Sequence, residues 1–212
     1  IGTSTEIIEA AADKLGLKVE YVEEIGWGTI GEGFKTNRYD AVCTQMGPDK
    51  AKMRNFALSI PVFYSQMRLY GLAANSKLKN DIIINTNSTR IAVIDGALSQ
   101  NLAEENFPNA SLVRLTPSVS SAEYYLNVTT KKADLFIGDD DEVAAQKIAN
   151  PVLESVVPYK DITALPHVFA FPMDDIRLVY MMNTALQHLQ NDGTLKIIGQ
   201  NYKLLAIPAG VH

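Results

Sequence analysis

The chain has 212 residues with 24 acidic and 19 basic side chains, a net charge of −5 and a hydrophobic fraction of 47%, the composition of an ordinary globular protein with a real core. Negative charge without a basic cluster argues against a nucleic-acid surface. No apolar run reaches the ~20 residues that a membrane span needs and the first residues carry no basic leader, so we expect a soluble chain whose export signal has been removed or was never present. Cys43 is the only cysteine, which excludes an internal disulfide.

The chain is expected to open on a helix and a strand. Thr3 and Glu6 have the spacing of a capping box, and apolar residues then recur at helical spacing until Gly16. Residues 18–23 alternate between apolar and polar side chains, which is typical of a strand.

A glycine-rich stretch follows at residues 26–31, Gly-Trp-Gly-Thr-Ile-Gly, and it matches the GxGxxG pattern of dinucleotide sites. That fingerprint needs an acidic residue at the end of the next strand, whereas Asp40 opens the next strand and Gln45 closes it. We therefore interpret the stretch as a turn and a helix start, with Trp27 packing on its lobe.

The stretch from residue 39 to residue 61 predicts a strand end suited to a small ligand. A short β-rich segment meets a Gly-Pro break, and a charged helical turn follows. The break leaves the backbone of Gln45, Met46 and Gly47 at the carboxyl end of a strand, where open α/β sheets usually bind ligands. Lys52 comes about one helical turn later and brings positive charge back over this strand end.

The second half of the chain alternates strands with helices. An extended strand at 63–74 is followed by strands at 90–94, 112–115 and 133–137, each leading into a helical pattern. This spacing implies βαβ units and a mostly parallel sheet.

The last part of the chain is expected to return to the first lobe. A short strand at 168–171 crosses back, and an amphipathic helix at 174–190 and a last helix through Tyr202 follow. We therefore expect an α/β fold of two lobes joined by two crossing strands. Residues 1–74 with 167–212 form lobe 1, and residues 75–166 form lobe 2.

Two strand ends of the second lobe carry candidate binding groups. Asp139 follows a predicted strand, at a position where a carboxylate can make charge-assisted bonds to an ammonium group. The acids after it, Asp140 and Asp141, are accounted for by the positive end of a helix. In the stretch Gly96, Ala97, Leu98 and Ser99, backbone N–H groups at a helix start can bind an anion. Ser99 either adds a hydroxyl to that site or is a plain helix-start serine.

No motif predicts catalysis, a metal or a cofactor. The three histidines are scattered, and none pairs with a carboxylate at metal-ligand spacing. The chain has no GxSxG, HExxH or Walker loop. We expect no cofactor, no metal and no catalytic residues.

The stretch 39–61 resembles the family 3 extracellular solute-binding proteins, because Asp40, Met46, Ser59 and Pro61 fall on that family's pattern without a gap. The resemblance extends to Asp192-Gly193-Thr194-Leu195 as the turn between the closing helices and to Trp27 as the tryptophan before the second helix. It implies a type II periplasmic-binding-protein-like fold. In the family a further strand and a ligand-contacting loop precede the first helix, and this sequence lacks both.

The resemblance implies a monomeric periplasmic or extracellular protein that captures an amino acid or related amine between its lobes for an ABC transporter permease. The implied ligand residues are those introduced above: Trp27, Gln45, Met46, Gly47, Lys52, Gly96, Ala97, Leu98, Ser99 and Asp139. Asp139 corresponds to the aspartate that binds a ligand's ammonium group.

Three departures from the family weaken recognition of an α-carboxylate. Gly47 stands where the family has Thr or Ser, Lys52 stands where it has the carboxylate-binding Arg, and Ala97-Leu98 replaces two threonines. Together these changes cost roughly 2–4 kcal/mol of binding free energy. A ligand with an ammonium group and a weaker or absent carboxylate suits these residues better.

Two alternatives share the implied fold. One is the extracellular ligand-sensing domain of a membrane receptor, which flanking transmembrane helices in the full gene would favour. The other is an enzyme similar to the cyclohexadienyl dehydratases, which resemble this family.

Overall fold

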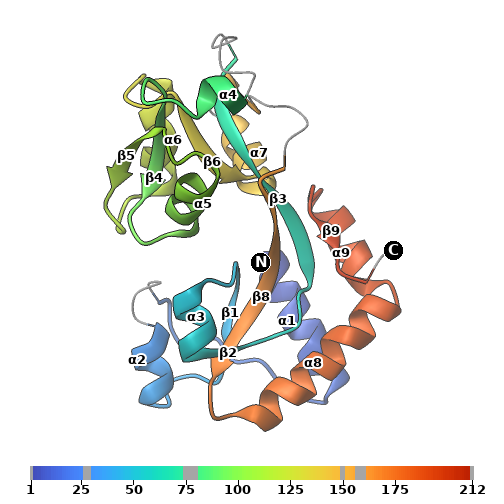
Figure 1. Cartoon of the computed structure of the whole chain (residues 1–212). Helices are drawn as coiled ribbons and strands as arrows, with labels where there is room; N and C mark the ends of the chain where they lie inside the picture. The colour runs from blue at the N-terminus through green and yellow to red at the C-terminus, as the bar shows by residue number, and fades with distance from the viewer. Residues whose placement is uncertain (1, 26–29, 74–80, 149–150, 156–160, 211–212) are drawn as a thin grey trace. The chain divides into compact units, whose positions relative to one another are not determined.

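The computed structural model describes residues 2–25, 30–73, 81–148, 151–155 and 161–210 (Figure 1). The chain forms two compact units: unit 1 is Ile1–Ser65 with Pro166–His212, and unit 2 is Gln66–Leu165. Two strands, β3 (Phe63–Leu72) and β8 (Thr163–Pro172), begin in one unit and end in the other. The first change of unit falls inside β3, earlier in the chain than the predicted end of lobe 1 at residue 74. No helix in the described ranges is both long and apolar enough to cross a membrane.

Unit 1 is built on strands that pair in antiparallel fashion. Both β1 (Val42–Met46) and β2 (Phe56–Leu58) pair with β8, and β9 (Ile207–Pro208) pairs with the first residues of β3. The helices of unit 1 are α1 (Thr3–Lys14), α2 (Ile30–Lys35), α3 (Lys50–Asn55), α8 (Ile176–Asn191) and α9 (Thr194–Asn201).

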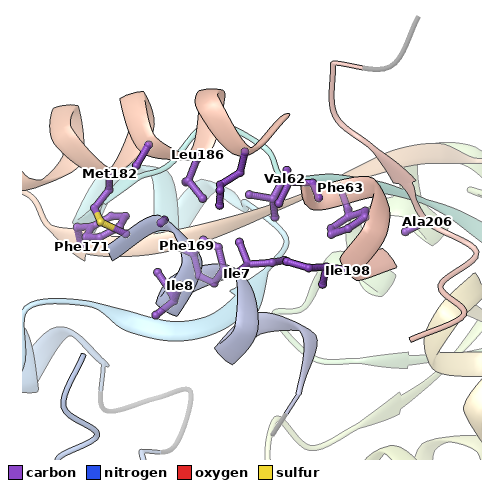
Figure 2. Close-up of a cluster of buried hydrophobic side chains, with 14 residues drawn as sticks. Ile7, Ile8, Val62, Phe63, Phe169, Phe171, Met182, Leu186, Ile198 and Ala206 are labelled. Carbon is purple, nitrogen blue, oxygen red and sulfur yellow. The ribbon is translucent and has the colours of Figure 1, made fainter. Parts of the chain in front are cut away.

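The alternation of side chains along β8 separates two apolar clusters in unit 1. Phe169 and Phe171 point to one face, where residues of α1, α8 and α9 pack around them, as Figure 2 shows. Val168 and Ala170 point to the other face and pack against α2 and β1. Successive side chains of a strand face opposite sides, so both faces of this strand are buried. The lone cysteine, Cys43 of β1, is half-buried against the first cluster.

Two predictions for the start of the chain are wrong. The capping box does not form, because Gly2 is the N-cap residue of α1 and no side chain caps the helix, which places Thr3 already inside it. Residues 18–23 do not form a strand. A strand needs a neighbouring strand for its backbone hydrogen bonds, and Tyr21 and Val22 are instead more than half exposed, at 54% and 56%.

Unit 2 contains the predicted parallel sheet. Strand β4 (Arg90–Ile94) pairs in parallel with β5 (Ser111–Leu115) on one side and β6 (Leu135–Asp139) on the other. The second half of β3 runs antiparallel to β6 and to the short β7 (Leu153–Ser155). The helices of this unit are α4 (Asp81–Ile84), α5 (Leu98–Asn106), α6 (Ser121–Thr129) and α7 (Asp140–Lys147).

Helices cover both faces of the unit 2 sheet. Leu102, Ala103 and Phe107, from α5 and the residue after it, pack on one face, while Tyr124 and Tyr125 of α6 pack on the other, together with Val143 of α7. Strands β4 and β6 are therefore buried on both faces, which is why their sequences are nearly continuous apolar runs, whereas the outer strand β5 is only partly covered.

Candidate ligand-binding site

The strand order of unit 2 indicates the end of the sheet at which a ligand is expected. Strand β4 lies between β5 and β6, and the helices that follow β4 and β6 pack on opposite faces of the sheet. Loops that leave two neighbouring parallel strands toward opposite faces open a crevice at the carboxyl ends of those strands. The turn at Gly96 follows β4, and Asp139 ends β6, so both predicted groups lie at this edge.

Asp139 is the N-cap residue of α7. Its Oδ1 accepts hydrogen bonds from the backbone N–H groups of Asp141 (2.9 Å) and Glu142 (3.1 Å). These bonds satisfy donors that a helix start leaves unpaired. They also fix the direction of the carboxylate relative to the first turn of α7.

The residue after it, Asp140, is more than a helix-start acid. It is only 8% exposed. Its Oδ2 accepts from Nη1 of Arg68 at 2.5 Å, and its Oδ1 accepts from the Tyr70 hydroxyl. Arg68 also donates through Nε to Asp161 at 2.6 Å. The buried carboxylate is thus paired, as a buried charge must be.

The pKa shifts of Arg68 and Tyr70 agree with their contacts to Asp140 and Asp161. Burial would lower the pKa of Arg68, but the hydrogen bond to Asp161 and the charges of Asp140 and Asp161 outweigh burial and raise it. Burial, followed by the hydrogen bond to Asp140, raises the pKa of Tyr70. Arg68 therefore stays charged and Tyr70 stays protonated around neutral pH.

The Gly96 turn uses part of its hydrogen-bonding capacity internally. Gly96 has a positive φ of 75°, which favours glycine. Its N–H group donates to Oε1 of Gln100 at 2.8 Å, and the N–H group of Ala97 donates to the Ile94 carbonyl at 3.0 Å. An anion at these two groups would have to displace those partners.

The side chains after this turn point into the unit. Leu98 packs against the apolar cluster of α5. Ser99 is 7% exposed, and its hydroxyl accepts from the Ile94 N–H group at 3.2 Å. This contact supports the role of Ser99 as a plain helix-start serine, which was one of the two roles considered for it.

The predicted unit 1 residues gather at the end of β1. Met46 is buried in the cluster beside α2, and the Gln45 N–H group donates to the Ser4 hydroxyl at 3.2 Å. Gly47 follows β1 directly and is half-buried. Trp27 lies outside the described residues.

Lys52 is held by its own helix. Asp49 is the N-cap residue of α3, accepts from the Lys52 N–H group at 2.8 Å and forms an ion pair with the Lys52 ammonium group. Burial opposes the shift, but the bonds from Lys52 outweigh it and lower the pKa of Asp49. A ligand carboxylate at Lys52 would compete with this fixed carboxylate.

Sequence reasoning did not anticipate Arg68 and Tyr70 as partners of Asp140. One signal was present: Arg68 is a charged residue inside an otherwise largely apolar strand, and such a residue needs a partner. Among the residues that the structure describes, no group of three or more His, Cys, Asp and Glu side chains could hold a metal ion.

Sequence comparison finds two relevant matches. The model of the family described as bacterial extracellular solute-binding proteins, family 3, matches residues 1–204. A Haemophilus influenzae protein described as a probable amino-acid ABC transporter-binding protein is 24% identical over 200 residues, which cover 93% of this chain and 74% of the relative.

Two solved structures have similar folds. An ancestral amino acid-binding protein, a precursor of cyclohexadienyl dehydratase, has a TM-score of 0.76 at 24% identity, over 95% of this chain and 84% of the other. An amino acid ABC transporter substrate-binding protein from Streptococcus pneumoniae, solved bound to L-arginine, has a TM-score of 0.76 at 15% identity, over 95% and 83%. These likenesses confirm the predicted type II periplasmic-binding-protein-like fold.

Proposed function

Because this chain belongs to the bacterial extracellular solute-binding proteins, family 3, we propose that it captures an amino acid or a related amine outside the cytoplasm and presents it to an ABC transporter permease. The relative from Haemophilus influenzae supports the transporter, since its description names one. The L-arginine in the Streptococcus pneumoniae structure supports an amine-bearing solute.

One observation carries the proposal: an acidic residue, Asp139, caps a helix at the carboxyl edge of a parallel sheet, next to the Gly96 turn. A carboxylate there makes charge-assisted bonds to an ammonium group. We propose Asp139 as the ammonium partner and the backbone of residues 96–99 as a second contact. Gln45, Met46, Gly47, Lys52 and Trp27 stay predicted contacts from unit 1.

A thermal-shift screen of amino acids, amines and small carboxylates tests the proposal. A ligand at one hundred times its Kd stabilises the folded state by about 2.7 kcal/mol, which a melting curve detects. Asp139→Asn keeps a capping side chain and removes the charge, so we expect it to abolish the shift from an amine-bearing ligand. Asp141→Asn is the matched control and should keep the shift. Equal losses from the two variants would show that the site is misplaced.

The role of the ligand's carboxylate can be tested separately. We expect agmatine, which lacks the carboxylate of L-arginine, to bind at least as tightly as L-arginine, because Lys52 is already paired with Asp49. Lys52→Met should then leave agmatine binding unchanged. A large loss of L-arginine binding in Lys52→Met would instead assign Lys52 to the carboxylate.

We propose a binding role and not a catalytic one. The family is defined by substrate binding. Turnover of prephenate or arogenate by the purified protein would contradict this part of the proposal.

A further inference from the structure

We propose that Arg68 and Tyr70 are positioning residues of the solute site, which act through Asp140 to fix the first turn of α7 and thereby the Asp139 carboxylate. This inference rests on the proposed function, because it takes Asp139 as the ammonium partner. Neither residue is expected to touch the solute.

The register of the sheet places both residues beside the site. On β3, Arg68 lies opposite Gly138 of β6 and Met67 lies opposite Asp139, while Tyr70 lies opposite Phe136. Arg68 and Tyr70 are two residues apart, so their side chains leave the strand on the same face. There they hold one oxygen each of the Asp140 carboxylate.

Close packing leaves α7 little freedom to move as a whole. A Cβ atom at Gly138 would lie 2.8 Å from Cε2 of Phe136 and from Cγ2 of Val143, so β6 and α7 meet closely at this glycine. The Tyr70 ring stacks on Phe136 with a centroid distance of 5.5 Å. The orientation of the first turn then depends on Asp140, which is the first residue of α7 and is held from β3.

Asp140 is joined to Asp139 by a peptide bond, and the turn that begins at Asp140 is hydrogen-bonded to the Asp139 carboxylate through its next two residues. Asp139 precedes Asp140, and its Oδ1 accepts from two N–H groups of the same turn. A rotation of this turn would swing the Asp139 carboxylate with it. Because a hydrogen bond to an ammonium group depends strongly on distance and direction, loss of this support should weaken solute binding.

Arg68 extends the same support to the strand that leaves the unit. Its Nε atom donates to Asp161, which shortly precedes β8, and the Ile162 N–H group donates to the Met67 carbonyl at 2.9 Å. Arg68 therefore joins β3, the start of α7 and the approach to β8. A lysine has a single ammonium group and cannot hold both acids in the same way as the guanidinium fork.

The variant that tests the inference is Arg68→Lys, with Arg90→Lys as its matched control. Arg90 also donates two hydrogen bonds to one carboxylate, from Nε and Nη2 to Asp134 at 3.0 and 2.9 Å. Arg90 is the first residue of β4, so it lies at the amino end of this strand, away from the carboxyl ends where Asp139 and Gly96 lie. Both variants keep their positive charge, so they differ in which end of the sheet is disturbed.

The first measurement needs no ligand. Solvent exchange of the Asp141 and Glu142 amide protons, followed by NMR, reports on their hydrogen bonds to Asp139. We expect the exchange rate to rise about fivefold in Arg68→Lys, which corresponds to losing the stabilisation of about one helix cap. The exchange rate should be unchanged in Arg90→Lys. Tyr70→Phe removes only a hydroxyl group, so it serves if Arg68→Lys fails to fold and should change exchange in the same direction. Unchanged exchange in the folded variants would overturn the inference.

The second measurement is the Kd for L-arginine. We expect it to rise about fivefold in Arg68→Lys and to stay within twofold in Arg90→Lys. If Asp139→Asn abolishes binding while Arg68→Lys binds like the wild type, the inference fails and the proposed function stands. If Asp139→Asn itself binds like the wild type, the proposed site fails. If the wild-type protein does not bind L-arginine, the exchange measurement decides.

Discussion

Tyr124 and Tyr125 are neighbours on α6 whose hydroxyl groups have different surroundings. The Tyr124 hydroxyl donates to the carbonyl oxygens of Ala92 (3.1 Å) and Ile137 (3.0 Å). The Tyr125 hydroxyl is buried without a hydrogen-bond partner among the described residues. Burial, followed by the charge of the Glu142 carboxylate, raises the pKa of Tyr125, although that carboxylate does not meet hydrogen-bond geometry with the hydroxyl. The same chemical group is therefore stabilising at one position and costly at the next.

Removing these two hydroxyl groups should have opposite effects on stability. Tyr124→Phe removes a buried hydroxyl group that is hydrogen-bonded and should lower the free energy of unfolding by about 1–2 kcal/mol. Tyr125→Phe removes an unpaired buried group and should raise it by about 1 kcal/mol. Urea denaturation of both variants measures the difference, and equal losses would contradict it.

Asp134 should give the protein part of its acid sensitivity. Burial would raise the pKa of Asp134, but hydrogen bonds from Arg90 and its charge outweigh burial and lower it. Because the folded-state pKa lies below the unfolded value of about 3.9, the stabilisation is present above about pH 4 and is lost as the pH falls further. We expect the free energy of unfolding of Asp134→Asn to fall less steeply below pH 4 than that of the wild type. Equal slopes would show that the Arg90 pair contributes nothing.

At the scale of an element, α2 has two glycines in different surroundings. A Cβ atom at Gly31 would meet Cε1 of Phe56 at 3.6 Å, an ordinary contact. A Cβ atom at Gly33 would lie 2.0 Å from the hydroxyl oxygen of Tyr39 and 2.1 Å from its Cζ. Tyr39 is held in place, because its hydroxyl donates to the Ile30 carbonyl at 3.0 Å.

Alanine substitutions at these glycines should therefore differ in sign. Gly31→Ala should stabilise the protein by about 0.5–1 kcal/mol, since alanine loses less backbone entropy in a helix. Gly33→Ala must displace the Tyr39 ring and should cost about 1–3 kcal/mol. Thermal unfolding of the two variants checks this, and stabilisation by both would mean that the Tyr39 ring moves freely.

The elements that the sequence predicted best are the parallel strands of unit 2, whose local composition marks them. The runs at 90–94 and 133–137 are largely apolar because both faces of β4 and β6 are covered, so their length and composition were enough to predict strands. Residues 18–23 had the alternation that is typical of a strand but pair with no strand in the described part of the chain, which a local pattern cannot reveal. The position of Asp139 followed directly from the end of its strand.

The contacts that hold the first turn of α7, and with it Asp139, did not follow from the sequence. Arg68 and Asp140 are 72 residues apart, and only the register between β3 and β6 brings them together. The contact of Gln100 with the Gly96 N–H group, four residues away, was likewise not predicted, because several side chains could fill that role. Long-range pairing and the choice among local partners are properties of the folded chain.

At the scale of the whole molecule, unit 2 is a continuous piece of chain with its own buried clusters. All members of both clusters lie between Met67 and Leu165. We expect a fragment of residues 66–165 to unfold cooperatively on heating, as measured by circular dichroism. A fragment of residues 75–166, the predicted lobe 2, lacks Met67, Leu69 and Tyr70 and should be less stable. Equal melting temperatures would favour the division at residue 74.

The half-buried thiol of β1 has a practical consequence. Burial, followed by the charge of Glu9, raises the pKa of Cys43, so little reactive thiolate forms near neutral pH. A cysteine introduced at an exposed position of α7, such as Ala145→Cys, would therefore take up a maleimide dye in preference to the native one. This chain can carry a single fluorophore on α7, the helix that Asp139 caps, without first removing its own cysteine, which makes it a convenient optical sensor for whichever solute it captures.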